Sequence, residues 1–359
     1  MPFILQKKKG DKMRKLASVQ VIWDIQPIEG ADKIELVSVL GWKCVAKKGD
    51  FKKGDICVYF EVDAFLPIDE KFEFLRNGCY KKNDINGEGF LIRTRTFRGQ
   101  ISQGLVLPLS ILGESNRKWE VGESVASFLG VKKWEIAEIA TGSGKIIGDF
   151  PGGIPKTDET RVQEIPEIIK EFDNREYYIS TKMDGTSVTM YLIDESFGVC
   201  SRNYELADDE TSPAWRFVHK KGIKEKIQTG AKALSVKNLA VQGEFCGEGI
   251  QKNPLKLSQP NWYVFTLIDL DKNKRLGLEE LKIFSEASKI DMVPVEETGP
   301  NLPYKTVDEL IERAKGKYKS GNNKEGIVIR PTVPVYSPIL MGPLSFKVIN
   351  NDYLIKQKD

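Results

Sequence analysis

The hydrophobic pattern of the first third of the chain predicts short β-strands separated by turns. Its apolar segments are rich in Val, Ile, Tyr and Phe, and glycines separate them. The clearest four are Val19–Ile25, Glu35–Leu40, Trp42–Ala46 and Ile56–Glu61. The pattern continues over residues 89–112. Several strands at roughly ten-residue spacing predict a small β-barrel.

The second half of the chain mixes strand-like and helix-like patterns. Its predicted strands are Tyr177–Thr181, Ser187–Ile193, Leu239–Phe245, Trp262–Leu270, Gly326–Arg330 and Ser345–Ile349. Its predicted helices are His219–Leu234, Leu278–Ile290 and Thr306–Tyr318. Thr306 followed by Glu309 predicts a capping box at the start of the last helix. The whole pattern predicts an α+β protein.

A stretch dense in glycine and proline separates the two halves. The density is greatest over residues 151–155, and no other break of this kind occurs nearby. We therefore expect a barrel domain over residues 1–145, a linker over 146–165 and a second domain over 166–359.

Composition excludes several functional classes. A single histidine, His219, argues against Ser-His-Asp catalysis and excludes multi-histidine metal sites, so we expect it on a helix surface. The five cysteines never approach CxxC spacing, which argues against a zinc ribbon and is typical of reduced thiols. No apolar run approaches the length of a membrane span. These features predict a cytoplasmic protein that does not cross a membrane.

Six short motifs in the second domain carry the candidate chemistry. Each motif is common by itself, and the information lies in their order along the chain. They are KMDG at 182–185, CSRN at 200–203, GEF at 243–245, WYVFT at 262–266, EGIV at 325–328 and SFK at 345–347. In this order they resemble the motifs of covalent nucleotidyltransferases, the superfamily of ATP-dependent ligases and mRNA capping enzymes. The resemblance implies an adenylyltransferase domain with antiparallel sheets and flanking helices.

The resemblance also assigns roles to residues. It implies that Lys182 attacks the α-phosphate of ATP and becomes lysyl-AMP. A lysine attacks only as the neutral amine, so its ordinary pKa of about 10.4 must be lowered. Asp184 and Glu325 are the expected ligands of a hydrated Mg²⁺, with Mn²⁺ as an alternative. Further ATP-binding residues are expected to be Gly185, Arg202, Glu244, Phe265 and Lys347.

Two features narrow the family. Only twelve residues follow Lys347, where DNA ligases and capping enzymes carry a further domain. The N-terminal segments IEGADKIELVSVLGWKCVAKKGD and FRGQISQGLVLP resemble OB-fold modules of the tRNA-binding type. Together they resemble nick-sealing RNA ligases with an N-terminal OB domain. The same resemblance implies that Arg161 contacts ATP phosphates, although an ordinary linker arginine is the alternative.

One departure from the family pattern concerns the last motif. Phage-type RNA ligases have a K-x-K pair there, whereas SFKVIN provides only Lys347. Depending on the alignment, Ser345 or Ile349 occupies the other position. Arg161, Lys324 and Lys356 are candidate replacements for the missing cation.

The predicted barrel has the charge expected of a nucleic-acid-binding domain. Residues 1–54 contain twelve Lys or Arg against six Asp or Glu, although the whole chain has a net charge of only +3. Trp42 and Phe97 are the candidate stacking rings. The candidate cations are Lys43, Lys47, Lys48, Lys52, Lys53, Arg93, Arg95 and Arg98.

These observations predict an ATP- and Mg²⁺-dependent RNA ligase that seals 3′-OH/5′-phosphate breaks. The expected partner is a nicked duplex of RNA or an RNA/DNA hybrid, and the expected state is a monomer. The sequence leaves open whether each side of the break must be RNA. Two alternatives remain: a GTP-dependent capping-type guanylyltransferase, and a nucleic-acid-binding protein with an inactive nucleotidyltransferase domain.

Overall fold

The computed structural model describes residues 14–113, 117–135 and 144–356, and the chain divides into two compact units, Met1–Ile136 and Ala137–Asp359. The expected domain boundary at residue 145 adjoins residues 136–143, which lie outside the described part. The predicted linker, 146–165, lies within the second unit. Within the described residues, no helix is both long enough and apolar enough to cross a membrane.

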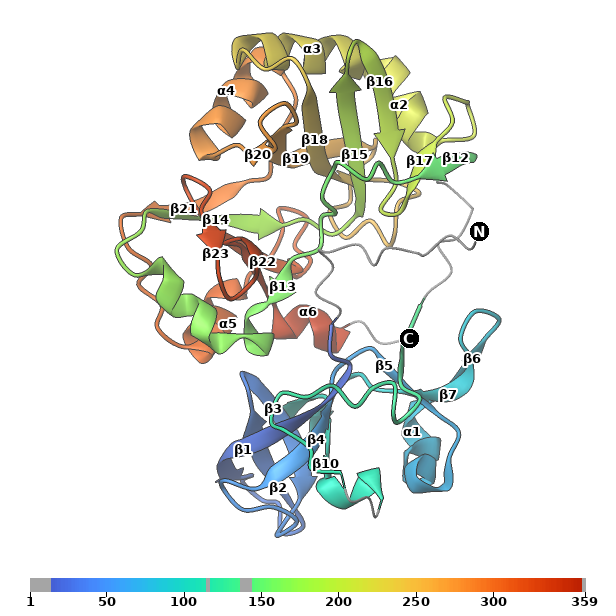
Figure 1. Ribbon diagram of the computed structural model, residues 1–359, viewed down its shortest axis with the longest axis vertical. Coiled ribbons are helices and arrows are strands. Elements are labelled where there is room, and N and C mark those ends of the chain that lie inside the picture. The colour runs from blue at the N-terminus through green and yellow to red at the C-terminus, as the bar shows by residue number, and fades with distance from the viewer. Residues whose placement is uncertain (1–13, 114–116, 136–143, 357–359) are drawn as a thin grey trace. The chain divides into compact units, whose positions relative to one another are not determined.

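The first unit is built on two antiparallel sheets (Figure 1). Strand β1 pairs with β4 through its first half and with β2 through its second half, with a register shift between Ile22 and Asp24. Such an irregularity lets one strand bend and take part in both sides of a small barrel. The five-stranded sheet has the order β10-β4-β1-β2-β3, made of Leu105–Pro108, Ile56–Phe60, Ala17–Pro27, Ile34–Val39 and Trp42–Lys47. All four strands predicted in this region are confirmed.

The remaining elements of the first unit are short. The second sheet, β11-β5-β7-β6, comprises Lys132–Lys133, Ala64–Pro67, Gly87–Leu91 and Tyr80–Asn83. The hairpin of β8 (Thr94–Phe97) and β9 (Gln100–Gln103) packs next to β3. Three short helical turns complete the unit: η1 (Glu70–Leu75), α1 (Arg76–Cys79) and η2 (Leu109–Leu112).

The prediction that Trp42 stacks on nucleic acid is wrong. Its side chain is fully buried in a core with Val37, Cys44 and Tyr59 and therefore has no surface for a base. Phe97 is exposed, as predicted, and so is Trp23 on β1, with exposed fractions of 41% and 50%; Phe74, Tyr80 and Phe128 are exposed as well.

The second unit contains two further sheets (Figure 1). The seven-stranded sheet, β12-β17-β16-β15-β18-β19-β20, comprises Ile146–Asp149, Tyr204–Leu206, Ser196–Cys200, Thr186–Ile193, Leu239–Cys246, Asn261–Asp269 and Lys274–Arg275. The five-stranded sheet, β13-β25-β22-β14-β21, comprises Thr160–Arg161, Phe346–Ile349, Gly326–Pro331, Tyr177–Lys182 and Val295–Gly299. A small hairpin, β23 (Tyr336–Ser337) and β24 (Gly342–Pro343), separates β22 from β25. The α+β prediction is confirmed.

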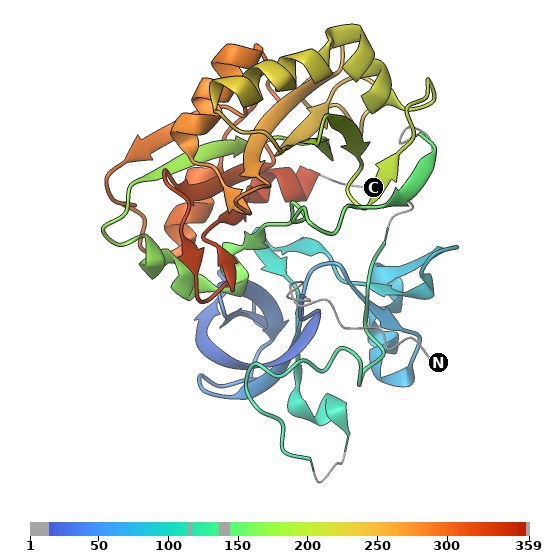
Figure 2. The same cartoon turned by 45° about the horizontal axis from the view of Figure 1, so that its top comes forward.

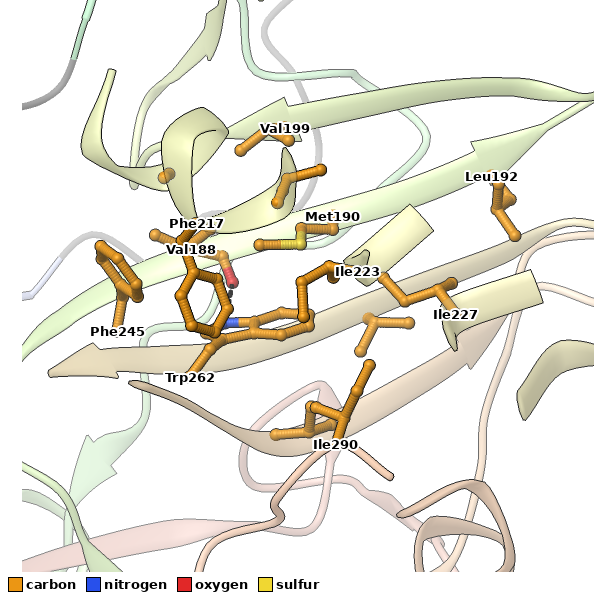
Figure 3. Close-up of a cluster of buried hydrophobic side chains, with 14 of the residues drawn as sticks. Val188, Met190, Leu192, Val199, Phe217, Ile223, Ile227, Phe245, Trp262 and Ile290 are labelled. Atoms are coloured by element: carbon orange, nitrogen blue, oxygen red, sulfur yellow. Dashed lines mark hydrogen bonds between the residues drawn. The ribbon is translucent and has the colours of Figure 1, made fainter. Parts of the chain in front are cut away.

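Helices α2, α3 and α4 cover one face of the seven-stranded sheet (Figures 1 and 2). They span Pro213–Lys221, Ile223–Ala233 and Leu278–Ser288. The core beneath them includes Val188, Phe245 and Trp262, and the Trp262 indole donates a hydrogen bond of 3.2 Å to the Val188 carbonyl (Figure 3). Residues alternate along β18, so Gln242 and Glu244 face the other side of this sheet.

One predicted helix is two helices. The single helix expected over 219–234 breaks at Gly222, whose φ of +59° belongs to the left-handed region. His219 lies exposed at the end of α2, as predicted. The capping box of α5 (Val307–Ala314) is confirmed, because Thr306 and Glu309 bond reciprocally.

The five-stranded sheet has its own core against α5 and the 3₁₀ turns η3 (Val162–Glu164) and η4 (Pro166–Phe172). Phe172 and Phe346 meet edge to face at its centre. The short helix α6 (Asn351–Lys356) directly follows β25. This hydrophobic core therefore supports the strands β14, β22 and β25.

Candidate active site

Lys182 is the last residue of β14 and lies opposite Gly326 on β22. This register places the residue before Gly326, Glu325, next to the lysine. The Lys182 Nζ donates to Glu325 Oε2 at 2.7 Å, and both side chains are mostly buried. The KMDG and EGIV motifs, far apart in sequence, therefore meet through their charged residues.

Three carboxylates surround the Lys182 amine. Burial lowers its pKa, but the charges of Glu325, Glu244 and Asp184 outweigh burial and raise the pKa above the ordinary lysine value. In this state Lys182 is an ammonium ion. An ammonium ion is not a nucleophile, and another positive charge among the carboxylates would favour loss of its proton.

Glu244 lies on β18 opposite Ser187 of β15, and its Oε1 accepts a hydrogen bond of 3.2 Å from the Gly185 N–H. Burial and the nearby Glu325 raise the pKa of Glu244 to about 7. A Cβ on Gly185 would lie 2.3 Å from the Phe245 carbonyl oxygen. Only glycine therefore lets the chain after Lys182 pass this close to β18.

Lys347 on β25 lies opposite Val328 of β22 and beside Arg161, which β13 places in parallel register with it. Burial, Lys182 and Arg161 together lower the pKa of Lys347 to about 8. Lys347 has no ion pair or hydrogen bond from its amine to any described residue. Lys347, with Arg161 of the predicted linker beside it, thus lies close enough to Lys182 for the two lysine charges to interact.

Lys324, another candidate for the missing cation, is bound elsewhere. Lys324 is 5% exposed and donates to both oxygens of Glu296, at 2.6 and 2.7 Å. The Lys356 side chain lies outside the described part of the structure. Arg161 is therefore the candidate that the register brings to Lys347.

Arg202 is the predicted phosphate ligand whose side chain already has a partner. Its Nη2 donates to Asp158 Oδ1 at 2.7 Å, and both side chains are substantially exposed. The Asp158 charge also raises the pKa of Lys347, which places this acid close to the lysine. A phosphate group bound by Arg202 would compete with Asp158 for this guanidinium.

Phe265 is half-buried on β19 beside the site. Its ring packs, together with that of Tyr263, against a small cluster that includes Met183. Tyr263 lies directly opposite Glu244 in the register of β18 and β19. Sequence reasoning missed Tyr263, because two aromatic residues of one strand fit the motif equally well.

Asp269 is the last residue of the same strand, β19, and is buried. Its carboxylate accepts bonds from the backbone and side chain of Lys272.

Two tyrosines near the motifs were also missed. The Tyr318 hydroxyl donates to the Lys182 carbonyl at 2.8 Å and accepts from the Glu325 N–H at 3.0 Å. The Tyr353 hydroxyl, on α6, donates to Asp184 Oδ2 at 2.7 Å. Both contacts join residues that no short motif contains, so the sequence offered no signal for them.

The carboxylates fit a cation that keeps most of its water. In the described ranges, no group of three or more His, Cys, Asp or Glu side chains is arranged to hold a metal ion. Burial raises the pKa of Asp184, and the neighbouring Glu325 charge raises it further. Mg²⁺ prefers oxygen ligands and keeps several of its waters, so these crowded carboxylates are groups that could hold it.

Comparison with known proteins matches each of the two units to a known kind of domain. A model described as an OB-fold domain matches residues 16–109, and the model of the RNA ligase family matches residues 175–349. No curated protein sequence matches the chain.

Solved structures of Naegleria gruberi RNA ligase match nearly the whole chain. A lysine-to-methionine variant with AMP and manganese is 36% identical, with a TM-score of 0.85 and coverage of 96% of this chain and 100% of that chain. The enzyme with pyrophosphate is also 36% identical, with a TM-score of 0.84 and coverages of 96% and 99%. A glutamate-to-alanine variant with ATP and manganese is 36% identical, with a TM-score of 0.85 and coverages of 96% and 100%.

The fold is that of an OB domain followed by a ligase domain. The chain belongs to the RNA ligase family.

Proposed function

We propose that this protein is an ATP- and divalent-metal-dependent RNA ligase that seals 3′-OH/5′-phosphate breaks in nicked duplexes through a lysyl-AMP. The observation that carries the proposal is the mostly buried Lys182–Glu325 contact of 2.7 Å, with two further carboxylates and Lys347 close to it, and with Arg161 beside Lys347. The similarity to Naegleria structures that contain ATP, AMP or pyrophosphate supports the choice of nucleotide.

In the first step the neutral Lys182 amine attacks the α-phosphorus of ATP. A P–N bond forms, the bond from the α-phosphorus to the bridging oxygen breaks, and pyrophosphate leaves. Lys347 and Arg161 offset the negative charge that develops on the phosphate oxygens. Arg161 then supplies the second cation that the last motif lacks.

Asp184 and Glu325 are the residues proposed to hold a hydrated Mg²⁺ or Mn²⁺. The ion would supply positive charge to the phosphate and to the carboxylates that otherwise hold Lys182 as an ammonium. Glu244 accepts hydrogen bonds from the ribose hydroxyls, and the N–H of Gly185 holds its carboxylate in place. Phe265 provides an aromatic surface for adenine.

Two transfers complete the reaction. A 5′-phosphate oxygen at the break attacks the phosphorus of lysyl-AMP, and the P–N bond breaks. The 3′-OH then attacks the activated 5′-phosphate and AMP leaves. We propose the domain division 1–145, 146–165 and 166–359, with the first domain binding nucleic acid through its exposed cations and the rings of Phe97 and Trp23.

The proposal is tested with ATP labelled on the α-phosphate. Incubation with Mg²⁺ followed by denaturation should leave label on the protein, whereas GTP labelled in the same way should leave none. Label from GTP alone supports a capping enzyme instead, and label from neither nucleotide overturns the proposal. Sealing of four nicks that vary RNA and DNA on each side of the break then defines the substrate.

A further inference from the structure

The turn between β25 and α6 is anchored to the residues that precede the EGIV strand. Asn350 is fully buried, and its amide donates to the Lys324 carbonyl at 3.0 Å. Its backbone N–H donates to the Glu325 carbonyl at 2.9 Å. Its Oδ1 accepts from the Asp352 N–H at 3.0 Å and caps α6. The start of α6 is therefore fixed relative to Glu325.

Because the start of α6 is fixed in this way, the side chain of Tyr353 reaches Asp184. The phenol donates to Asp184 Oδ2 at 2.7 Å across 169 residues of sequence. The other oxygen, Oδ1, accepts no hydrogen bond from any residue that the structure describes. A carboxylate bonded through one oxygen has a restricted rotation and presents the second oxygen in one direction.

We propose that Tyr353 is a positioning residue for a divalent cation: it holds the Asp184 carboxylate so that Oδ1 is free for a water-bound Mg²⁺. This inference rests on the proposed function, because Asp184 is the metal-side carboxylate there. Hydrogen bonds to the groups that face a metal commonly set their orientation, and removal of such a bond lowers metal affinity about tenfold to hundredfold. A hydrated ion is held through its water molecules, so the loss of metal affinity should be about tenfold, the lower end of this range.

The alternative is that Tyr353 only packs α6 onto the domain. The variant Tyr353→Phe separates the two roles, because it keeps the ring and removes the hydroxyl. Tyr304→Phe is the matched control, since Tyr304 also donates to a carboxylate of this unit, Glu297, at 3.0 Å. Thermal unfolding of both variants shows whether the fold is retained.

The experiment measures Mn²⁺ binding to the full chain by electron paramagnetic resonance in the presence of AMP, so that no reaction takes place. Tyr353→Phe should raise the Mn²⁺ dissociation constant about tenfold, and Tyr304→Phe should leave it unchanged. In a chain carrying Asp184→Asn, the further change Tyr353→Phe should have no effect, because the carboxylate it orients is gone.

A second readout is self-adenylylation at increasing Mg²⁺. The half-saturating Mg²⁺ concentration should rise about tenfold in Tyr353→Phe, while the rate at saturating Mg²⁺ stays within about twofold of wild type. An unchanged Mn²⁺ dissociation constant, or wild-type protein that binds no Mn²⁺, overturns the inference. Wild-type protein that binds Mn²⁺ but takes no label from ATP overturns the proposed function alone, and the binding measurement still decides the role of Tyr353.

Discussion

The two units of the chain carry their functional charges in opposite ways. In the ligase unit, Lys182 and Lys324 are buried, and each has a carboxylate partner within 2.7 Å. In the first unit, candidate nucleic-acid cations such as Lys47, at the end of β3, and Lys52, in the loop that follows, are exposed. A buried charge depends on a few fixed neighbours, whereas exposed charges act together through a shared field. Single substitutions should therefore have large effects in the ligase unit and small effects in the barrel.

The largest effect is expected at the nucleophile. Lys182→Ala should lower self-adenylylation by at least about 10³-fold, because no other group can form the P–N bond. Lys232→Ala, at an exposed lysine of α3, is the matched control and should react like wild type. Labelled ATP and denaturing electrophoresis measure both variants. A Lys182→Ala protein that still takes label would contradict the assignment of Lys182 as the nucleophile.

The next largest effect concerns stability. Lys324→Met should lower the free energy of unfolding by about 3 kcal/mol, because Glu296 would lose its closest cation in a mostly buried site. Lys237→Met breaks an ion pair with Asp194 in which both side chains are 73% exposed, so its effect should be much smaller than that of Lys324→Met. Urea denaturation measures both variants. Equal losses would show that burial does not govern these charges.

A smaller effect depends on pH. In the unfolded chain the carboxyl of Glu244 titrates near 4.5, and in the folded state its pKa is about 7. The folded state therefore binds this proton more tightly, and stability falls as pH rises through that interval. Without metal, Glu244→Gln should be more stable than wild type by about 1–2 kcal/mol at pH 8, with little difference at pH 4.5.

Glu248→Gln, at an exposed neighbour of the same motif, is the control for this pH effect and should show none. Urea midpoints in buffer with a chelator give the comparison. A stability gain for Glu244→Gln that is the same at both pH values would contradict the assignment of the raised pKa to Glu244.

The smallest effect per residue is expected in the barrel. Neutralising Lys47, Lys48, Lys52 or Lys53 singly should weaken binding of a nicked duplex by less than about threefold. Neutralising all four should reduce the slope of log affinity against log salt by up to about four. The matched control neutralises four lysines on the helices behind the ligase sheet: Lys220, Lys221, Lys224 and Lys232. If the control changes the slope equally, the barrel is not the preferred binding surface.

The same contrast separates what the sequence predicted from what it missed. The ordered motifs pointed to Lys182, Glu244 and Glu325, because each motif is a short run of residues that can be recognised without knowing how the strands pair. The contact between Tyr353 and Asp184 spans 169 residues and depends on how α6 leaves β25. No periodicity encodes such a contact.

In the barrel, the sequence pattern also failed to predict which of two tryptophan rings is exposed. Trp42 and Trp23 both lie on apolar strands, and the pattern does not tell which ring faces the core. The register shift in β1, between Ile22 and Asp24, falls at Trp23, and the structure leaves that ring half exposed while Trp42 is buried. Likewise, Gly222 divides a run of residues that by composition favours one helix. The register shift at Trp23 and the left-handed backbone at Gly222 interrupt a regular pattern, and a pattern alone does not predict such interruptions.

The most direct test of the account is to locate the adenylate on the protein. After reaction with ATP and Mg²⁺, digestion and mass spectrometry should find AMP on the peptide containing Lys182, joined through a bond that acid cleaves and alkali does not. Adenylate on any other residue, or an adduct stable in acid, would contradict the assignment of Lys182 as the nucleophile.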